Sequence, residues 1–189
     1  MAWNDDPQPV LTTARLRLRP MTLADGPRVE ALAGERAIAD TTAGVPHPYP
    51  EGGGAAWIST HPSRWRSGSE IVFGLALPAT DEIIGVIGLV VYQADNAAEL
   101  GYWLGVPYWS HGYMSEAAAE AIDFAFEVVG LSRVYAVHLT RNPASGRVME
   151  KAGMQLEGIE RGVMGRWGVY EDQARRAILR SDWEELRRR

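Results

Sequence analysis

A chain of 189 residues is long enough for one well-buried α/β domain and short for two. Hydrophobic residues make up 46% of it and charged residues 23%, which is the balance of a globular protein rather than a disordered one. The net charge of −5 argues against a nucleic-acid-binding protein with a broad basic surface. Because the chain has no cysteine, disulfides, thiol nucleophiles and thiolate metal sites are excluded.

The histidines and the apolar runs narrow the class of protein further. No two of the four histidines stand four residues apart, as they would in a helical zinc site, so we expect no metal. No basic-then-apolar leader opens the sequence, and no apolar run approaches the length of about 18 residues that a membrane span needs. We therefore expect a cytoplasmic protein that binds neither a membrane nor nucleic acid.

The first third of the chain predicts a strand, two helices and a loop. Residues 1–10, with two prolines and two aspartates, are expected to be a loose lead-in. Residues 15–20, RLRLRP, alternate arginine with leucine and stop at a proline, which predicts a first strand. Weaker helical patterns cover 22–33 and 52–67, and the proline- and glycine-rich stretch 43–54 between them predicts a loop.

The remainder predicts one mixed sheet with helices on both faces. Three strands with short connections, hence a meander, are expected over 70–77, 83–91 and 99–105. An amphipathic helix over 115–129 follows, with acids on one face and apolar residues on the other. Then come a strand over 133–139, a helix over 142–153, and strands over 154–160 and 169–180.

The turn in WSHGYMSEA (109–117) places Gly112 just before that long helix. A helix start offers four unpaired N–H groups and the positive end of the helix dipole, and a glycine lets a phosphate approach them closely. Ser115 could add a hydroxyl or cap the helix. One glycine before a helix is common, and neither GxGxxG nor GxxxxGK[ST] is present, so the turn alone favours a purely structural role.

Two polar side chains further along are candidates for chemistry. Asn142 followed by Pro143 is a clear helix start, and on that helix Ser145 is a lone hydroxyl on an apolar face. Such a hydroxyl either bonds back to a backbone carbonyl or acts on a ligand, and we favour the ligand. Glu99 opens the strand over 99–105 and should point the same way as Trp103, either as an exposed strand-end acid or as a proton acceptor.

Together these segments resemble the Gcn5-related N-acetyltransferase (GNAT) superfamily, and within it the ribosomal-protein N-terminal acetyltransferase (RimJ/RimL-like) branch. The resemblance is carried, in order, by TARLRLRP, ELGYWLGVPYWSHGYMSEA, NPASGRVMEKAGM and RGVMGRWGVYED. In that family the turn before the long helix reads Gln/Arg-x-x-Gly-x-Gly/Ala and binds the pyrophosphate of acetyl-CoA. Here Trp109, Gly112 and Met114 fill those slots, so only the glycine matches, and His111 stands where this branch often has arginine.

The resemblance implies a single α/β (α+β) GNAT domain over residues 1–189. Its sheet would be mixed, mostly antiparallel and twisted, with about seven strands and helices on both faces. The fourth and fifth strands, 99–105 and 133–139, would splay apart, and the pantetheine arm of acetyl-CoA would lie in the gap. The cofactor-binding residues so implied are Leu104, Gly105, Val106, Ser110, His111, Gly112, Tyr113, Met114, Ser115, Asn142 and Ser145.

The expected reaction is direct attack of a primary amine on the thioester in a ternary complex, with no metal. Glu99 would accept the amine's proton through water, and Ser145 would protonate or stabilise the leaving thiolate. A strand N–H near residues 104–106 would stabilise the oxyanion. The acceptor implied by the resemblance is a protein or peptide α-amino group.

Other functions remain open at this point. The acceptor could be a small amine such as an amino acid, a polyamine or an aminoglycoside. The chain could also be a non-catalytic acyl-CoA-binding sensor, or an interaction module in which Gly112, Asn142 and Ser145 are only turn and cap residues. We expect residues 43–54 and 52–67 to shape the acceptor site, and the oligomeric state, a homodimer included, is left open.

Overall fold

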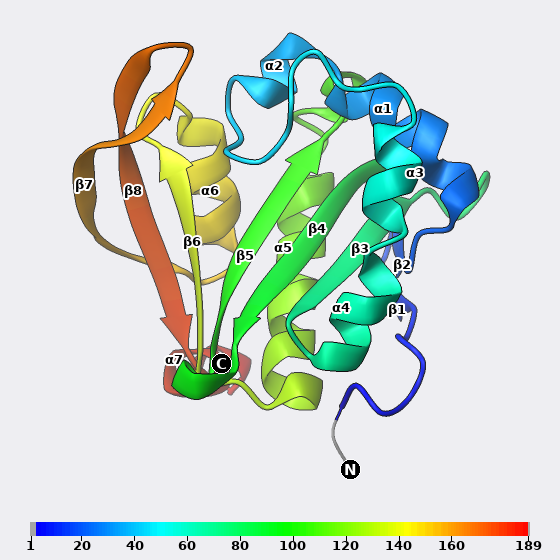
Figure 1. Cartoon of the computed structure of the whole chain (residues 1–189). Coiled ribbons are helices and arrows are strands. Elements are labelled where there is room, and N and C mark those ends of the chain that lie inside the picture. The colour runs from blue at the N-terminus through cyan, green and yellow to red at the C-terminus, as the bar shows by residue number, and fades with distance from the viewer. Residues whose placement is uncertain (1–2, 189) are drawn as a thin grey trace.

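The computed structural model describes residues 3–188, except for the side chains of residues 164–166. Its centre is an eight-stranded sheet in the order β1-β2-β3-β4-β5-β6-β8-β7 (Figure 1). Neighbouring strands are antiparallel except β5 and β6, which are parallel, so the sheet is mixed and mostly antiparallel as expected. The strands are β1 (Leu11–Thr12), β2 (Arg17–Arg19), β3 (Glu70–Ala76), β4 (Ile83–Tyr92), β5 (Ala97–Leu104), β6 (Arg133–Leu139), β7 (Gln155–Arg166) and β8 (Val169–Leu179).

Helices cover both faces of this sheet. Helices α1 and α3 lie on one face and α5 and α6 on the other (Figure 1). No helix in the described part of the chain is long and apolar enough to cross a membrane. The helices are α1 (Gly26–Ala33), α2 (Arg36–Ala39), α3 (Gly53–Ile58), α4 (His61–Ser67), α5 (Tyr113–Phe124), α6 (Pro143–Lys151) and α7 (Arg180–Arg187), with 3-10 turns at Leu23–Asp25, Gln93–Asp95 and Val106–Tyr108 and a π-helical end at Ala125–Val129.

The two hydrophobic cores explain why the central strands are apolar on both sides. In β4, Ile84 and Ile87 are fully buried in the core under α5, while Val86 is buried in the core under α1. A strand covered by helices on both faces has no solvent side, so its sequence is a continuous apolar run rather than an alternating one. Small residues of α5, including Ala118, are completely buried and let this helix approach the sheet closely.

Strands β5 and β6 pair only at one end. Their register runs from Ala97 with Arg133 to Glu99 with Tyr135, and no pairing is present beyond it along the described strands. Figure 1 shows the two strands diverging from that point. The splay expected between the strands over 99–105 and 133–139 is confirmed. These strands are β5 and β6, and not the fourth and fifth, because the two-residue strand β1 was not predicted.

Several elements differ from the sequence-based expectation, among them β5, which begins at Ala97 before Glu99, and β7, which continues to Arg166. The helix expected over 52–67 is divided into α3 and α4, because Pro62 stands in the first turn of α4 and cannot donate the backbone bond of a continuous helix. The last strand ends at Leu179 and α7 follows, with Trp183 packed on Phe126. The short helix α2 falls in a stretch for which no element was predicted.

The N-terminal lead-in is irregular but anchored. Its described residues up to Val10 form no helix or strand. The Trp3 ring packs edge-on against Trp65 at 4.9 Å, and the Trp65 indole donates to the Asp6 carbonyl at 2.9 Å. The side chain of Gln8 donates to the carbonyl of Val72 at 2.8 Å. These contacts fix the segment on α4 and β3, so it is not loose.

Candidate active site

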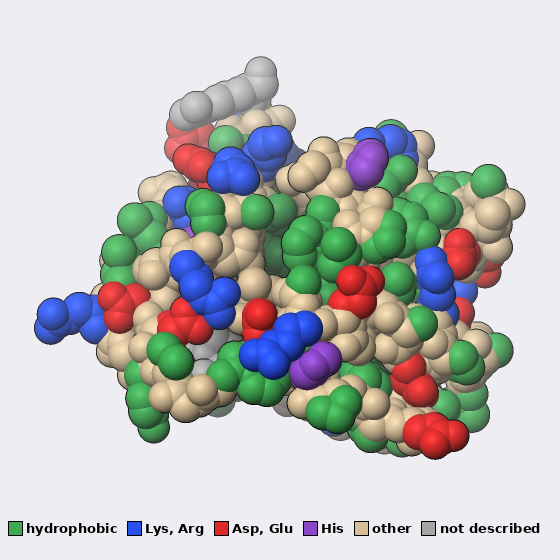
Figure 2. Space-filling view, turned by 90° about the horizontal axis from the view of Figure 1, so that it is seen from above, with side chains coloured by type: hydrophobic (Ala, Val, Ile, Leu, Met, Phe, Trp, Pro, Cys, Tyr) green, Lys and Arg blue, Asp and Glu red, His purple; other side chains and the backbone are tan. Residues whose placement is uncertain are grey.

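A cavity of about 750 Å³ opens where β5 and β6 separate. Figure 2 looks onto this end of the molecule, where hydrophobic side chains gather around a hollow. Residues 41–46 and Tyr49 line one side of the cavity. That the 43–54 loop shapes the acceptor site stays a prediction. Its other walls come from the sheet face, the split and α6, and include Val72, Val86, Val90, Trp103, Leu100, Tyr102, His138, Leu139, Ser145 and Met149.

Glu99 and Ser145 both line this cavity, although they were identified on separate sequence segments. Glu99 is the last residue of β5 that pairs with β6, so it lies at the closed end of the split. Its carboxylate faces the hydroxyls of Tyr135 at 3.3 Å and Tyr92 at 3.5 Å. Burial raises the pKa of Tyr135, and Tyr92 and Glu99 beside it add to that effect, so this phenol stays protonated and donates to the carboxylate.

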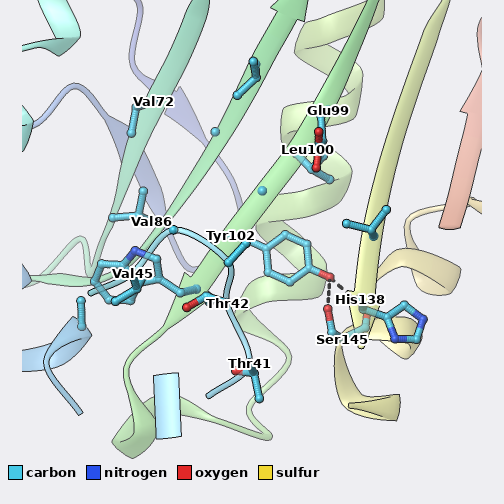
Figure 3. A pocket seen from close by; sticks show the side chains of 18 of the residues that line it. Thr41, Thr42, Val45, Val72, Val86, Glu99, Leu100, Tyr102, His138 and Ser145 are labelled. Atoms are coloured by element: carbon cyan, nitrogen blue, oxygen red, sulfur yellow. Dashed lines mark hydrogen bonds between the residues drawn. The ribbon is translucent and has the colours of Figure 1, made fainter. Parts of the chain in front are cut away.

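Ser145 is not the lone hydroxyl that the sequence indicated. Its Oγ lies 2.9 Å from the phenolic oxygen of Tyr102, which also donates to the Ser145 carbonyl at 3.0 Å (Figure 3). Burial raises the pKa of Tyr102 to about 12, so the phenol is protonated at neutral pH. Tyr102 was not predicted as a site residue. The one sequence signal for it is strand alternation, which places Tyr102 on the other face of β5 from Glu99.

Asn142 caps helix α6, as its position before Pro143 predicted. The side-chain Oδ1 of Asn142 accepts a hydrogen bond from the backbone N–H of Ser145 at 3.3 Å. The backbone N–H of Asn142 donates to the carbonyl of Leu139 at 2.8 Å. The cap therefore fixes the first turn of α6, and with it Ser145, at the end of β6. A contact between Asn142 and the cofactor stays a prediction.

The open edge of β5 presents backbone groups to the split. The N–H of Gly105 donates to the Ile84 carbonyl at 2.9 Å and is thus engaged with β4, which argues against Gly105 as an amide donor in the split. Backbone groups alternate between the two edges of a strand, so those of Tyr102 and Leu104 face β6. The indole of Trp109 donates to the Leu104 carbonyl at 2.6 Å, leaving the Leu104 N–H as the group to pair with a ligand.

The turn before α5 is built from two left-handed residues, Ser110 at φ +63° and Gly112 at φ +81°. Gly112 is the N-cap of α5, so the helix begins at Tyr113, two residues earlier than predicted. Ser115 lies inside the first turn and is not the cap. A left-handed residue followed by helical residues points successive backbone N–H groups toward one position. This arrangement forms a small concave site that can bind an anion. The exposed position of Gly112 leaves that point open to solvent.

The side chains of this turn have separate roles. The His111 ring stacks on Tyr113 at 5.9 Å, and its Nδ1 lies 2.7 Å from the Trp109 carbonyl. The side chain of Met114 is buried in the core, so only its backbone can face a ligand. Val106 begins the 3-10 turn that links β5 to this segment. Except for Ser145, the expected cofactor residues lie outside the described lining of the cavity.

Comparison with known proteins agrees with this geometry. The family model described as an acetyltransferase (GNAT) domain matches residues 15–155. The uncharacterized N-acetyltransferase YoaA of Bacillus subtilis is 31% identical over 165 residues, which cover 87% of this chain and 93% of YoaA. The ribosomal protein uS5-alanine N-acetyltransferase of Escherichia coli is 31% identical over 120 residues, which cover 62% of each chain.

A solved structure supports the fold independently of sequence identity. The ribosomal L7/L12 α-N-protein acetyltransferase RimL in complex with coenzyme A superposes with a TM-score of 0.83 at 17% identity, over 90% of this chain and 98% of RimL. The family model alone spans about three quarters of the sequence. This chain therefore belongs to the GNAT acetyltransferase family.

Proposed function

We propose that this N-acetyltransferase transfers the acetyl group of acetyl-CoA to the α-amino group of a protein or peptide. The observation that carries the proposal is the cavity at the β5–β6 split, which joins Glu99 at its closed end to Ser145 and Tyr102 on its α6 side. One relative acetylates an alanine of a ribosomal protein according to its name, and RimL is named for a protein α-amino group.

The residues present fit acetyl-CoA. The unpaired edge of β5 at Tyr102 and Leu104 would bind the pantetheine arm as a further strand would. The amides of Gly112 and Tyr113 would hold the diphosphate at the start of α5. When bound there, acetyl-CoA supplies an activated acetyl group as a thioester.

Within this site each side chain has one task. Glu99 accepts the proton of the attacking amine, directly or through a water, with Tyr92 and Tyr135 holding its carboxylate. A backbone N–H on the unpaired edge of β5 that the pantetheine arm does not use can donate to the developing oxyanion. Ser145 donates to the departing sulfur, and Tyr102 donates to Ser145.

The charges of the cavity favour an amine without a neighbouring carboxylate. Among the described lining residues the carboxylates are Glu70 and Glu99 and the arginine is Arg175. The guanidinium of Arg175 is held by Glu160 at 3.0 Å, so its positive charge is already compensated. A free amino acid would bring a carboxylate to a site without an unpaired arginine, whereas in a peptide that group is an amide.

The same argument admits a small amine that carries no carboxylate, so the acceptor must be tested directly. CoA release is measured with a peptide with a free N-terminus and blocked lysine, its N-terminally blocked counterpart with free lysine, and a polyamine and an aminoglycoside. Alanine and alanine amide form a pair that differs in the carboxylate, and they are compared at equal concentrations of neutral amine because the carboxylate also raises the pKa of the amine. We expect release with the free N-terminus, and with the amide well above the acid.

Acetylation of only the lysine-bearing blocked peptide, or of only the small amines, would refute the α-amino proposal. Binding of acetyl-CoA without turnover on any acceptor would instead identify a sensor.

A further inference from the structure

The turn that would hold the diphosphate has no basic residue of its own. Residues 109–114 contain neither arginine nor lysine, and Glu116 adds a negative charge in the first turn of α5. The start of a helix carries only about half a positive charge. A diphosphate placed at Gly112 would therefore be undercompensated by this turn alone.

Arg15, which lies 97 positions before Gly112 in the sequence, brings a guanidinium to this point. It stands between β1 and β2, and its Nη1 donates to the His111 carbonyl at 2.9 Å. Its Nε and Nη2 bind the Glu116 carboxylate at 2.8 Å and 2.7 Å. The guanidinium carbon lies 4.8 Å from the centre of the Tyr113 ring. Four contacts from three directions therefore fix the guanidinium beside Gly112.

Glu116 is in turn held by the backbone of the same segment. The Arg15 N–H donates to it at 2.8 Å, and the Thr13 hydroxyl makes a further short hydrogen bond. These hydrogen bonds and the ion pair lower the pKa of Glu116 against the opposing effect of its burial, so it is ionised. The negative charge of the Glu116 carboxylate is thus compensated by the Arg15 guanidinium.

The guanidinium retains donors for a ligand. Of the five N–H groups of an arginine, three are used here, one each from Nε, Nη1 and Nη2. One N–H on each terminal nitrogen is left, and both can donate to phosphate oxygens. The side chain is 47% exposed, and Nη2 lies 3.4 Å from where a Cβ would stand on Gly112. These two remaining N–H groups therefore lie at the surface of the turn.

We propose that Arg15 binds the diphosphate of the CoA substrate with these two N–H groups, which adds hydrogen-bond donors, not net charge, to the turn. The inference rests on the proposed acetyl-CoA site. The alternative is a purely structural role, in which Arg15 only attaches the N-terminal segment to α5. The two differ in their dependence on phosphate, because a fastening residue would affect every ligand of the split alike.

The test is the affinity of three ligands, measured by calorimetric titration and without turnover. CoA carries both the diphosphate and the 3′-phosphate, dephospho-CoA carries the diphosphate alone, and pantetheine carries neither. For Arg15→Gln we expect CoA and dephospho-CoA to bind about tenfold to a hundredfold more weakly, as for loss of hydrogen bonds from a charged donor. Pantetheine should bind equally well to both proteins.

Two variants serve as controls. Arg17→Gln removes a similarly exposed arginine two residues away, which pairs with Asp81 and not with the turn, and should leave all three affinities unchanged. Arg15→Lys keeps the charge without the two terminal nitrogens and should lie between Gln and the parent for the two phosphate-bearing ligands. Thermal melts of each variant show whether it is folded.

The outcomes separate this proposal from the proposed function. An equal loss for pantetheine and CoA, or no loss for CoA, means that Arg15 only fastens the fold. A loss for CoA but not for dephospho-CoA assigns Arg15 to the 3′-phosphate and overturns the diphosphate contact. If the parent protein binds none of the three ligands, the acetyl-CoA site itself is wrong.

Discussion

The phenolic oxygen of Tyr102 lies between the hydroxyl and the carbonyl oxygen of Ser145, 2.9 Å and 3.0 Å away. A phenol has one hydrogen, so it serves these two acceptors in turn. When it donates to the Ser145 hydroxyl, the hydrogen of Ser145 is free to point into the cavity and toward a leaving sulfur. Since the raised pKa of Tyr102, about 12, keeps it protonated, Tyr102 has the hydrogen with which to orient the Ser145 hydroxyl.

This relationship predicts that Tyr102 and Ser145 act as one unit. Tyr102→Phe and Ser145→Ala should each lower kcat by about tenfold to a hundredfold, with acetyl-CoA affinity changed by no more than a few-fold. The double variant should be no slower than the slower single variant, because residues that share one function are not additive. Multiplied losses in the double variant would mean that the two hydroxyls act independently, and parent-like single variants would remove both from the mechanism.

Gly112→Val tests the turn against a matched glycine. Gly112 and Gly130 have nearly equal positive φ angles, +81° and +84°, and flank the same helical segment. Valine at either position should cost about 1–2 kcal/mol of stability, because a β-branched residue is strained in the left-handed region. Only Gly112→Val should also weaken acetyl-CoA binding, measured by titration of the folded variant. Equal affinities of the two variants would make the turn merely structural.

Because of the buried His61 side chain, we expect the folded protein to lose stability in mild acid. Its ring is buried in α4, edge-on to Trp57 at 4.5 Å, with neither ring nitrogen paired in the described structure. Burial, with the charge of Arg64, lowers its pKa to about 4, against 6.5 in the unfolded chain. Between these values the unfolded chain binds more protons, so stability is full above pH 6.5 and falls toward pH 4.

The corresponding measurement is urea unfolding at two pH values. From pH 7.5 to pH 5, His61 should remove about 2 kcal/mol from the free energy of unfolding. His61→Leu should remove that part of the pH dependence, while acids such as Asp25, whose pKa is lowered in the folded state, keep theirs. A variant with the parent's full pH dependence would show that His61 is not the group that titrates.

Local sequence patterns predicted the elements that frame the site. Asn142 and Pro143 marked the start of α6 correctly because capping depends on neighbouring residues. The start of α7 was missed, since Leu179 and Arg180 interrupt the strand with neither glycine nor proline. The separation of β5 from β6 was predicted only through the family resemblance. It depends on how β6 packs with α6 and pairs with β8, and not on any sequence pattern within the two strands.

The contacts between elements were beyond local patterns. Tyr102 meets Ser145 across 43 residues, and Arg15 meets Glu116 across 101. Strand alternation places Tyr102 on the other face of β5 from Glu99, but which helical residue it meets depends on the docking of α6. Trp109 likewise appeared only as a departure from the family motif, whereas its indole binds the Leu104 carbonyl at the end of β5.

The last prediction concerns the proton of the acceptor. An α-amino group has a pKa near 8, so about one molecule in ten is neutral at pH 7 and nine in ten at pH 9. If Glu99 is the base, Glu99→Gln should lower kcat/KM on the order of a hundredfold at pH 7 and only a few-fold at pH 9. An acceptor amine of lower pKa should reduce the defect at pH 7 in the same way. Glu70→Gln is the matched control, since Glu70 also lines the cavity but is ion-paired with Arg64; any loss there should not depend on pH. A Glu99→Gln profile parallel to that of the parent, with both acceptors, would assign the proton to water and leave Glu99 to hold Tyr92 and Tyr135.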